Sequence, residues 1–416
     1  MSDIVRAQEF DNVPCPFCGL LCDDVRVTMT KGAATVIANG CAKSRVLFAA
    51  NANDAAIALA DGKPVDLATA IGRAAQILRA ARQPLLISAG TDVAGMRVLI
   101  ELAERCGGSV DHANGDALFR NLRVLQNTGW ISTTLAEIRN RADLLVVAGT
   151  GITGRFPRFF ERCFGNFETL FEVGARELWF LGDVPDDLPA ALRSRTRSLA
   201  IDPSRFTEFF AALRALFSAH VLKEKAVAGV PIGNLSELLE RMRAARYGVL
   251  AWTAADLAFP HADLAIQSMC EFVKALNSEK RFSVLPLGGS DADLTAQQVT
   301  TWQTGFPVRV NFNGGAPAQG AARRDEVDAM LFVSALDAGR TPPSGNIPSI
   351  VLGRAGMRAE GCSVFIPVSV PGLHHAGHLY RADNVVAIHL RKLAGSALPS
   401  AAQALQRILD TVREPH

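Results

Sequence analysis

The feature that most constrains the fold is a repeated alternation of apolar runs, glycine turns and helical patterns. Asp66 is expected to cap a helix over Leu67–Ala81, where apolar residues recur at helical spacing. This helix precedes the first run, Pro84–Gly90, and another helical pattern follows over Met96–Cys106. Later runs of the same kind are Asp143–Gly149, Leu178–Leu181, Gly248–Trp252, Phe282–Leu285 and Ala329–Val333. Apolar strands that alternate with helices are typical of parallel sheets covered on both faces. The pattern therefore predicts an α/β protein.

The positions of these runs predict three domains. Residues 1–50 form a small N-terminal domain that contains the cysteine motif described below. A discontinuous α/β domain comprises residues 51–113 and 246–416, and its C-terminal segment returns to the N-terminal domain. A second α/β domain is inserted at residues 114–245. The 416 residues are long enough for two or three domains of ordinary size.

Four cysteines near the start of the chain are its strongest chemical signal. Three lie in the pattern Cys15-x2-Cys18-x3-Cys22, and the fourth is Cys41. A [4Fe–4S] cluster needs four converging thiolates, which one short loop and one distant cysteine supply. A structural zinc ion also takes four thiolates but favours two separated Cys-x2-Cys pairs. The spacing favours the cluster, with zinc and an empty relic of a metal site as the alternatives.

Two alternating segments after this motif predict a β-hairpin. They are Val25–Met29 and Ala34–Ala38, joined by a turn at Lys31-Gly32. Because the strands of a hairpin run antiparallel, its open end would bring Cys22 and Cys41 close together. The hairpin therefore supports a shared site for the four cysteines.

Charge and hydropathy exclude several classes of function. The net charge is +2, which provides no basic field for nucleic acid. No apolar run approaches the roughly 20 residues of a membrane span, and Met1–Arg6 lacks the apolar core of a signal peptide. The remaining cysteines are scattered at Cys106, Cys163, Cys270 and Cys362. Free thiols of this kind are typical of a reducing compartment, so we expect a cytoplasmic protein that binds neither nucleic acid nor membrane.

Several motifs resemble one known family. They are the opening Cys15-Pro-Phe-Cys-Gly-Leu-Leu-Cys-Asp-Asp24, Cys41-Ala42-Lys43, Thr134–Asp143, Phe156-Pro157-Arg158 and Gly372-x4-Gly377-x2-Tyr380-Arg381-x-Asp383-Asn384. Together they resemble the B subunit of formylmethanofuran dehydrogenase, a molybdopterin/tungstopterin oxidoreductase, over essentially the whole chain. The resemblance implies a formate-dehydrogenase-like fold, with two doubly wound parallel-sheet domains and a small N-terminal cysteine-motif β domain.

The resemblance also assigns residues to a pterin site and shows that its central ligand is missing. It implies that Lys43 lies between the cluster and the pterin. The family binds its metal through a cysteine or selenocysteine followed by histidine. Alignment on Asp111 and Gln126–Gly129 places Ala117 at the cysteine and Leu118 at the histidine. Since a methyl group cannot replace a soft thiolate ligand, we expect no functional tungstopterin or molybdopterin.

Two hypotheses follow from the resemblance. In the first, the chain is a non-catalytic, structural subunit of a formyltransferase/hydrolase complex, which converts formyl-tetrahydromethanopterin to formate through a methanofuran-type carrier. The implied partners are a formyltransferase subunit, an amidohydrolase-like hydrolase subunit and a β-helical C-type subunit. In the second, the chain is an active tungsten or molybdenum formylmethanofuran dehydrogenase subunit. The cysteines and Lys43 favour the second hypothesis, whereas Ala117 and Leu118 favour the first.

Weaker signals occur elsewhere in the chain. Asp116 is an alternative oxygen ligand for the metal, and its ordinary interpretation is a solvated carboxylate. His374-His375-x2-His378 has a spacing that suits zinc, although no carboxylate or thiol is close in sequence. Gly288–Asp291 and Gly314–Pro317 are glycine turns, which resemble the family's loops around the pterin nucleotides and are also ordinary tight turns.

Overall fold

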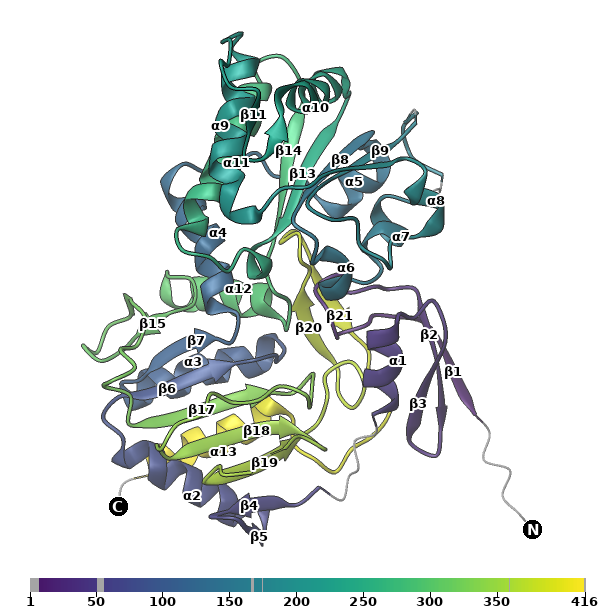
Figure 1. The fold of residues 1–416 in the computed structure, drawn as a ribbon. Coiled ribbons are helices and arrows are strands. Elements are labelled where there is room, and N and C mark those ends of the chain that lie inside the picture. Colours follow the sequence, from purple (N-terminus) through teal and green to yellow (C-terminus); the bar gives the residue numbers. More distant parts are fainter. Residues whose placement is uncertain (1–6, 51–55, 166–167, 174, 359, 415–416) are drawn as a thin grey trace. The chain divides into compact units, whose positions relative to one another are not determined.

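The structure, a computed structural model, describes residues 7–50, 56–165, 168–173, 175–358 and 360–414 (Figure 1). It divides into two compact units, described separately below. Unit 1 comprises Met1–Gly115 and Ser290–His416, and unit 2 comprises Asp116–Gly289. No helix among the described residues is long and apolar enough to cross a membrane. The segment Met1–Arg6, which the sequence excludes as a signal peptide, lies outside the described residues.

A small antiparallel sheet lies near the N-terminus of unit 1. Its strands, in spatial order, are β1 (Gln8–Val13), β2 (Val25–Thr30) and β3 (Ala33–Ala38). The turn between β2 and β3 has positive φ at Lys31 and Gly32, the conformation of a tight hairpin turn. The predicted hairpin is confirmed. The three strands belong to unit 1, so a separate N-terminal domain stays a prediction.

A large mixed sheet forms the centre of unit 1. Within the described residues its strand order is β16-β15-β7-β6-β17-β18-β19-β4-β5. The parallel strands are β7 (Ser109–His112), β6 (Pro84–Ser88), β17 (Ala329–Ser334), β18 (Ser349–Arg354) and β19 (Val364–Val368). The antiparallel edge strands are β16 (Ala318–Gln319), β15 (Val310–Asn311), β4 (Ala58–Ala60) and β5 (Lys63–Val65).

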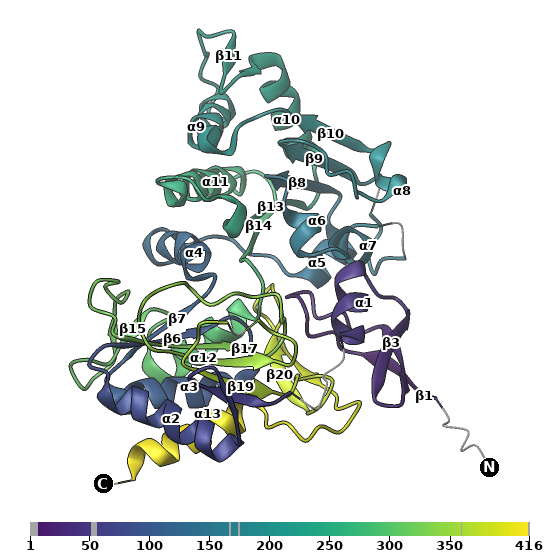
Figure 2. The same cartoon turned by 60° about the horizontal axis from the view of Figure 1, so that its bottom comes forward.

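In the described part of unit 1, four long helices accompany this sheet. They are α2 (Leu67–Ala80), α3 (Val93–Cys106), α12 (Asp293–Thr304) and α13 (Ala401–Arg413). The Asp66 carboxylate caps α2 by accepting from the Thr69 N–H at 2.7 Å, as the sequence predicts. Helix α13 packs against α2 and α3, and Figure 2 shows the three helices together on one side of the sheet. A separate hairpin of unit 1 pairs β20 (Gly377–Tyr380) with β21 (Ala387–Leu390).

Unit 2 contains a parallel sheet. Its strand order within the described residues is β10-β9-β8-β13-β14. The strands are β10 (Thr196–Leu199), β9 (Glu177–Leu181), β8 (Leu144–Ala148), β13 (Gly248–Thr253) and β14 (Phe282–Leu287). The helices are α4 (Gly115–Asn127), α5 (Leu135–Arg141), α6 (Ile152–Arg155), α7 (Phe159–Cys163), α8 (Ala190–Arg193), α9 (Phe206–Phe217), α10 (Ile232–Ala244) and α11 (Ala262–Leu276). A short hairpin joins β11 (Ala226–Val227) to β12 (Val230–Pro231).

The strand order reverses once in each parallel array. In unit 1 the chain passes from β6 to β7 on one side, and β17, β18 and β19 follow on the other side. In unit 2 the chain passes from β8 to β9 and β10, whereas β13 and β14 lie on the opposite side of β8. Ligands of α/β proteins bind at such reversals, beyond the carboxyl ends of the strands. These two reversals are therefore candidate ligand sites.

The α/β class with parallel sheets is confirmed, but one predicted border is wrong. The segment 246–289 belongs to unit 2 rather than to the discontinuous domain, because β13 pairs with β8 and β14 pairs with β13. The start of the inserted unit, predicted at 114, lies at Asp116. The apolar pattern of a strand such as Gly248–Thr253 does not indicate which sheet the strand joins. The sequence alone therefore assigned this strand to the wrong domain.

Candidate functional site

The segment Cys15–Cys22, here called the cysteine loop, is a compact turn that precedes β2. The Cys15 N–H donates to the Cys22 carbonyl oxygen at 2.8 Å, and the Leu21 N–H donates to the Cys18 carbonyl oxygen at 3.1 Å. Cys15, Cys18 and Cys22 are buried, and Cys41 is half-buried. The backbone bonds close the loop on itself, which draws its three cysteines into one small region.

Cys41 joins this region through the start of the next helix. It precedes α1 (Ala42–Ala49), and its Sγ accepts a hydrogen bond from the Ser44 N–H at 3.4 Å. Lys43 is half-buried in the first turn of the same helix. Cys41 is therefore held in place by the helix that also carries Lys43.

The four thiols influence one another electrostatically. Burial raises the pKa of the Cys15 thiol well above its usual value, and the neighbouring Cys18, Cys22 and Cys41 raise this pKa further. Metal binding requires the thiolate form, so a bound cation would have to reverse this shift. Nevertheless, no group of three or more His, Cys, Asp or Glu side chains in the described ranges is arranged to hold a metal ion. The donor chemistry fits a four-thiolate centre, and metal binding at these cysteines stays a prediction.

A buried arginine packs against the cysteine loop. Arg354, at the end of β18, is 0% exposed, and its guanidinium lies 5.6 Å from the ring of Phe17. It donates to the carbonyl oxygens of Leu47 at 2.6 Å and Ala50, at the end of α1. Phe17 also meets Phe48 edge to face, with ring centroids 4.9 Å apart. Burial lowers the pKa of Arg354 to about 10, so it remains charged at neutral pH.

Helix α4 carries Ala117 and Leu118, the positions that the sequence resemblance aligns with the family's metal ligand and histidine. Ala117 is 4% exposed and belongs to a hydrophobic cluster of unit 2 that includes Val124 and Trp252. Leu118 is 2% exposed. Asp116, the alternative oxygen ligand, is exposed in the first turn of the helix. The two positions therefore contribute packing to the protein interior rather than polar groups to a site.

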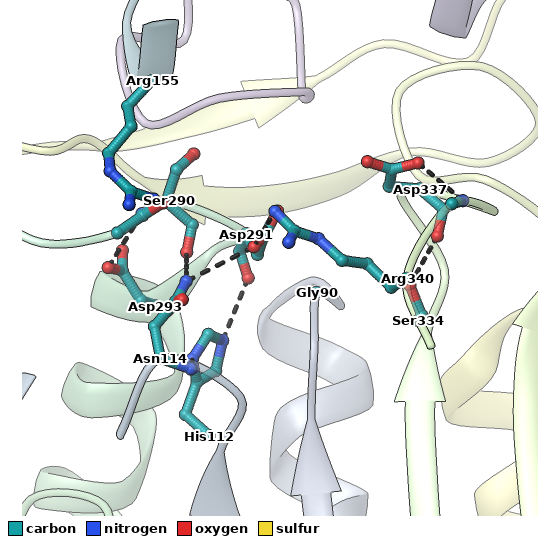
Figure 3. Close-up of polar contacts among 12 residues, drawn as sticks. Gly90, His112, Asn114, Arg155, Ser290, Asp291, Asp293, Ser334, Asp337 and Arg340 are labelled. Carbon is teal, nitrogen blue, oxygen red and sulfur yellow. Dashed lines mark hydrogen bonds and ion pairs between the residues drawn. The ribbon is translucent and has the colours of Figure 1, made fainter. Parts of the chain in front are cut away.

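The strand reversal of unit 1 is occupied by a polar network of the chain itself (Figure 3). The Asp291 side chain, 4% exposed, forms an ion pair with Arg340, which follows β17. The Asp291 carbonyl oxygen lies 3.1 Å from His112 Nε2, at the end of β7. Asn114 Nδ2 donates to the Ser290 carbonyl oxygen at 2.8 Å. Segments that are far apart in the sequence are thus joined where a ligand of an α/β sheet would enter.

The tautomer of His112 follows from its two partners. The Asn114 N–H donates to His112 Nδ1 at 2.9 Å, so Nδ1 is the acceptor and Nε2 carries the proton that is donated to Asp291. Burial lowers the pKa of His112 to about 4, although Asp291 opposes the shift. The imidazole is therefore neutral at physiological pH.

Three consecutive non-glycine residues bring this network to the cysteine loop. Ser290, Asp291 and Ala292 have φ of 81°, 61° and 57°, a conformation that L-residues rarely adopt. The Ser290 N–H donates to Asp293 Oδ2 at 3.0 Å, which secures the turn. The Gly19 N–H donates to Ser290 Oγ at 3.2 Å. The turn therefore connects the strand ends of the large sheet with the backbone between two of the cysteines.

The strand reversal of unit 2 carries a second ion pair. Asp256 lies just beyond β13, and Arg155 lies at the end of α6, soon after β8. Their side chains are 2.8 Å apart and about one third exposed or less. A Cβ on Gly151 would meet an Asp256 carboxylate oxygen at 2.0 Å, so this carboxylate fills the space beside the glycine. Both reversals thus hold an arginine and an aspartate of the chain itself.

The three histidines near the C-terminus and the glycine turn at Gly314–Pro317 have ordinary structural roles. His374 Nδ1 accepts from the Val370 N–H at 3.1 Å, His375 Nδ1 lies 2.9 Å from Ser369 Oγ, and His378 contacts His389 instead. The predicted three-histidine cluster therefore does not converge on one point. Gly315 has φ of 81°, and its N–H donates to Phe312 at 2.9 Å, as in a tight turn.

Sequence patterns indicate no role for His112 or Arg340 and mark Asp291 only as the end of a glycine turn. His112 and Asp291 are 179 residues apart, so no local spacing signals their contact. A signal existed only in the strand pattern, because polar residues directly after apolar strands line the carboxyl edge of a parallel sheet.

Comparisons with known proteins agree with the sequence motifs. No protein-family model matches the chain. The B subunit of tungsten-containing formylmethanofuran dehydrogenase 2 from Methanocaldococcus jannaschii is 27% identical over 411 residues, which covers 92% of this chain and 93% of that protein. The B subunit of the formyltransferase/hydrolase complex Fhc from Methylorubrum extorquens is 26% identical over 373 residues, covering 85% of this chain and 96% of that protein.

A solved structure extends the similarity to the fold. It is the X-ray structure of the formyltransferase/hydrolase complex FhcABCD from Methylorubrum extorquens with methylofuran. One of its chains matches with a TM-score of 0.74 and 27% identity, over 85% of this chain and 98% of that chain. The family predicted from the cysteine and C-terminal motifs is confirmed. The chain is a homologue of the B subunits of formylmethanofuran dehydrogenase and of the formyltransferase/hydrolase complex.

Proposed function

We propose that this chain is a non-catalytic, structural component of a formyltransferase/hydrolase complex. The observation that carries the proposal is the burial of Ala117 and Leu118, which stand where the family has its metal-binding cysteine and histidine. A methyl group offers no lone pair to tungsten or molybdenum, and an isobutyl group transfers no proton. The redox step of a dehydrogenase therefore has no residues to perform it at these positions.

The reaction of the assembly would be carried by other subunits. The relative from Methylorubrum extorquens belongs to a complex that is named for formyl transfer and hydrolysis and was solved with methylofuran. By similarity, we assign to the assembly of this chain the conversion of formyl-tetrahydromethanopterin to formate through a methanofuran-type carrier. Its partners would be a formyltransferase subunit, an amidohydrolase-like hydrolase subunit and a β-helical C-type subunit. This chain contributes surface to a cytoplasmic hetero-oligomer, not chemistry.

A metal centre at the cysteines is compatible with this structural role, whereas a bound pterin is not expected. Cys15, Cys18, Cys22 and Cys41 offer the four thiolates of a [4Fe–4S] cluster, which would act as a structural staple because ligand–metal bonds contribute to folding. A pterin would need a metal ligand, and ligands of α/β folds also bind at strand reversals. Asp291 with Arg340, and Asp256 with Arg155, occupy those places. We therefore expect no tungstopterin or molybdopterin.

Deletion and complementation in the native host test the structural role. Loss of this chain should abolish formyl-tetrahydromethanopterin hydrolysis in extracts and should prevent the other subunits from co-purifying. The wild-type chain and the variant Ala117→Cys should restore both properties equally, because the hydrolysis does not use this position. A deletion strain with full hydrolysis and an intact complex of the other subunits would refute the structural role.

The alternative is an active tungsten or molybdenum formylmethanofuran dehydrogenase subunit. The retained cysteines and Lys43, together with the similarity to the tungsten-containing archaeal protein, favour it. Elemental analysis of the purified native complex separates the two functions. For the structural role we expect at most about four iron atoms per chain and no stoichiometric tungsten or molybdenum. The complex should also fail to oxidise formate with a viologen dye. Stoichiometric tungsten or molybdenum would favour the alternative.

A further inference from the structure

The β20–β21 hairpin of unit 1 carries two histidines that the proposed function does not use. His378 on β20 lies directly opposite His389 on β21 in the antiparallel register. Both side chains are exposed. Side chains that are directly opposite on neighbouring strands are the closest cross-strand pairs in a sheet. The hairpin therefore presents two imidazoles side by side to solvent.

The rings are already in contact at a distance that suits a shared ion. His389 Nδ1 lies 3.3 Å from His378 Nε2, and the ring centroids are 4.9 Å apart. Two imidazole nitrogens that bind one zinc ion at about 2.0–2.1 Å in tetrahedral geometry are themselves about 3.3 Å apart. Small rotations about the side-chain bonds would turn both lone pairs toward one point without moving the strands.

The opposite face of the hairpin holds these positions in place. Leu379 and Leu390 are buried in a cluster with Leu21 and Leu336. The Tyr380 N–H also donates to Thr295 Oγ1 at 2.9 Å, which ties β20 to α12. The backbone that carries the two histidines is thus anchored on both strands. A site on such a backbone loses little entropy when it binds an ion.

We propose that His378 and His389 form a bidentate site for a late first-row divalent ion such as Zn²⁺ or Ni²⁺, with water at the remaining positions. Imidazole favours these ions over Mg²⁺ and Ca²⁺, which prefer oxygen ligands. Without the ion, one ring nitrogen donates its proton to the other. When the ion binds, the ring that donated moves this proton to its second nitrogen, so no net proton is released. This site is separate from the four cysteines and does not depend on the proposed function.

Titration calorimetry with Ni²⁺ on the purified full-length chain tests the site. The variants are His378→Ala, His389→Ala and, as a matched control, His220→Ala, which removes an exposed histidine of unit 2. Each pair variant should weaken the association by at least tenfold, because one imidazole alone remains, whereas His220→Ala should bind as the wild type does. Circular dichroism should show all four proteins folded, since the three side chains are exposed.

The spectrum of bound Co²⁺ distinguishes this site from the cysteines. Thiolate ligation gives an intense charge-transfer band that imidazole and water ligation lacks. After the thiols are alkylated, we expect the wild type to bind one Co²⁺ without this band, and we expect both pair variants to lose this ion. Identical Ni²⁺ isotherms in the wild type and both pair variants, or Co²⁺ binding that disappears on alkylation, would overturn the proposal.

Discussion

The cysteine loop and the start of α4 differ in what each retains of the family's site. The loop keeps three of the four thiols of the family motif, and Phe17 within it packs against Phe48 and the buried Arg354. The start of α4 has Ala117 and Leu118 at the positions that the sequence resemblance aligns with the family's cysteine and histidine, and both are buried. Because packing contributes to the shape of the loop, its residues have a structural role even if no electron transfer takes place there.

The chemistry of the side chains explains why the two regions differ. A free cysteine behaves as a small apolar group and is readily tolerated in an interior. A buried histidine without a ligand must find hydrogen-bond partners or lose free energy. Replacement by leucine removes that cost and adds apolar burial of about 1.5–3 kcal/mol. This contrast favours leucine over an unliganded histidine at position 118, whereas it gives no reason for alanine at position 117, where a thiol would also be tolerated.

Restoring the family residue in α4 should give the largest effect. Leu118→His places an imidazole where an isobutyl group is 2% exposed, and we expect the free energy of unfolding to fall by about 3–5 kcal/mol. Leu118→Met conserves volume and polarity and should cost less than about 1.5 kcal/mol. Urea unfolding of both variants measures the difference. If Leu118→His is as stable as the wild type, the position lines a polar site and is not part of the core.

The next largest effect should be the loss of stability on acidification, which comes from His112 in the polar network and not from the cysteine loop. His112 has a pKa of about 4 when folded and about 6.5 when unfolded. Below about pH 6.5 the unfolded chain binds more protons at this residue than the folded chain does. Stability should therefore fall as the pH drops from about 6.5 to 4, by about 3 kcal/mol.

The variant His112→Gln isolates this contribution. Glutamine has no titrating group, so the difference between its unfolding free energy and that of the wild type should change with pH only within this window. Equilibrium urea unfolding at intervals between about pH 7.5 and 4.5 gives both curves. Parallel curves would show that the imidazole is not buried in its neutral form.

Sequence patterns were sufficient for some parts of this molecule and insufficient for others. The Asp66 cap of α2 and the β2–β3 hairpin follow from short-range chemistry, and both are present. The membership of Gly248–Thr253 in unit 2 depends on pairing with β8, a partner about one hundred residues away that an apolar run does not specify. The Asp291–Arg340 pair was missed for the same reason, since the glycine turn that ends at Asp291 gives no signal for a partner on a distant segment.

The cysteine loop itself gives an intermediate effect. Cys18→Ser replaces a buried thiol with a hydroxyl and should lower the unfolding free energy by about 2 kcal/mol, and by more where a metal is bound. Cys106→Ser changes a half-buried helix residue and should cost less than about 1 kcal/mol. Thermal unfolding and iron content, measured on both variants, test the contrast. Equal effects of the two substitutions on both readouts would show that the loop has no special role.

The smallest change in unfolding free energy should come from the hydrogen bond that links the cysteine loop to the turn with positive φ at residues 290–292. Ser290→Ala removes the oxygen that accepts from the Gly19 N–H, and a hydrogen bond of this kind contributes about 1 kcal/mol. Ser268→Ala, which removes a hydroxyl on the surface of unit 2, is the matched control and should change stability by less than about 0.5 kcal/mol.

Hydrogen exchange shows where this loss occurs. Without its acceptor, the Gly19 amide should exchange faster in Ser290→Ala, together with its neighbours in the cysteine loop, while amides of β8 in unit 2 keep their rates. Because Ser290 lies at the turn that also carries Asp291, a loss of protection that spreads to His112 would mean that the loop and the network open as one unit. Unchanged exchange at Gly19 would mean that packing of Phe17 alone holds the loop. Both the loop and the start of α4 would then be stabilised by apolar contacts only.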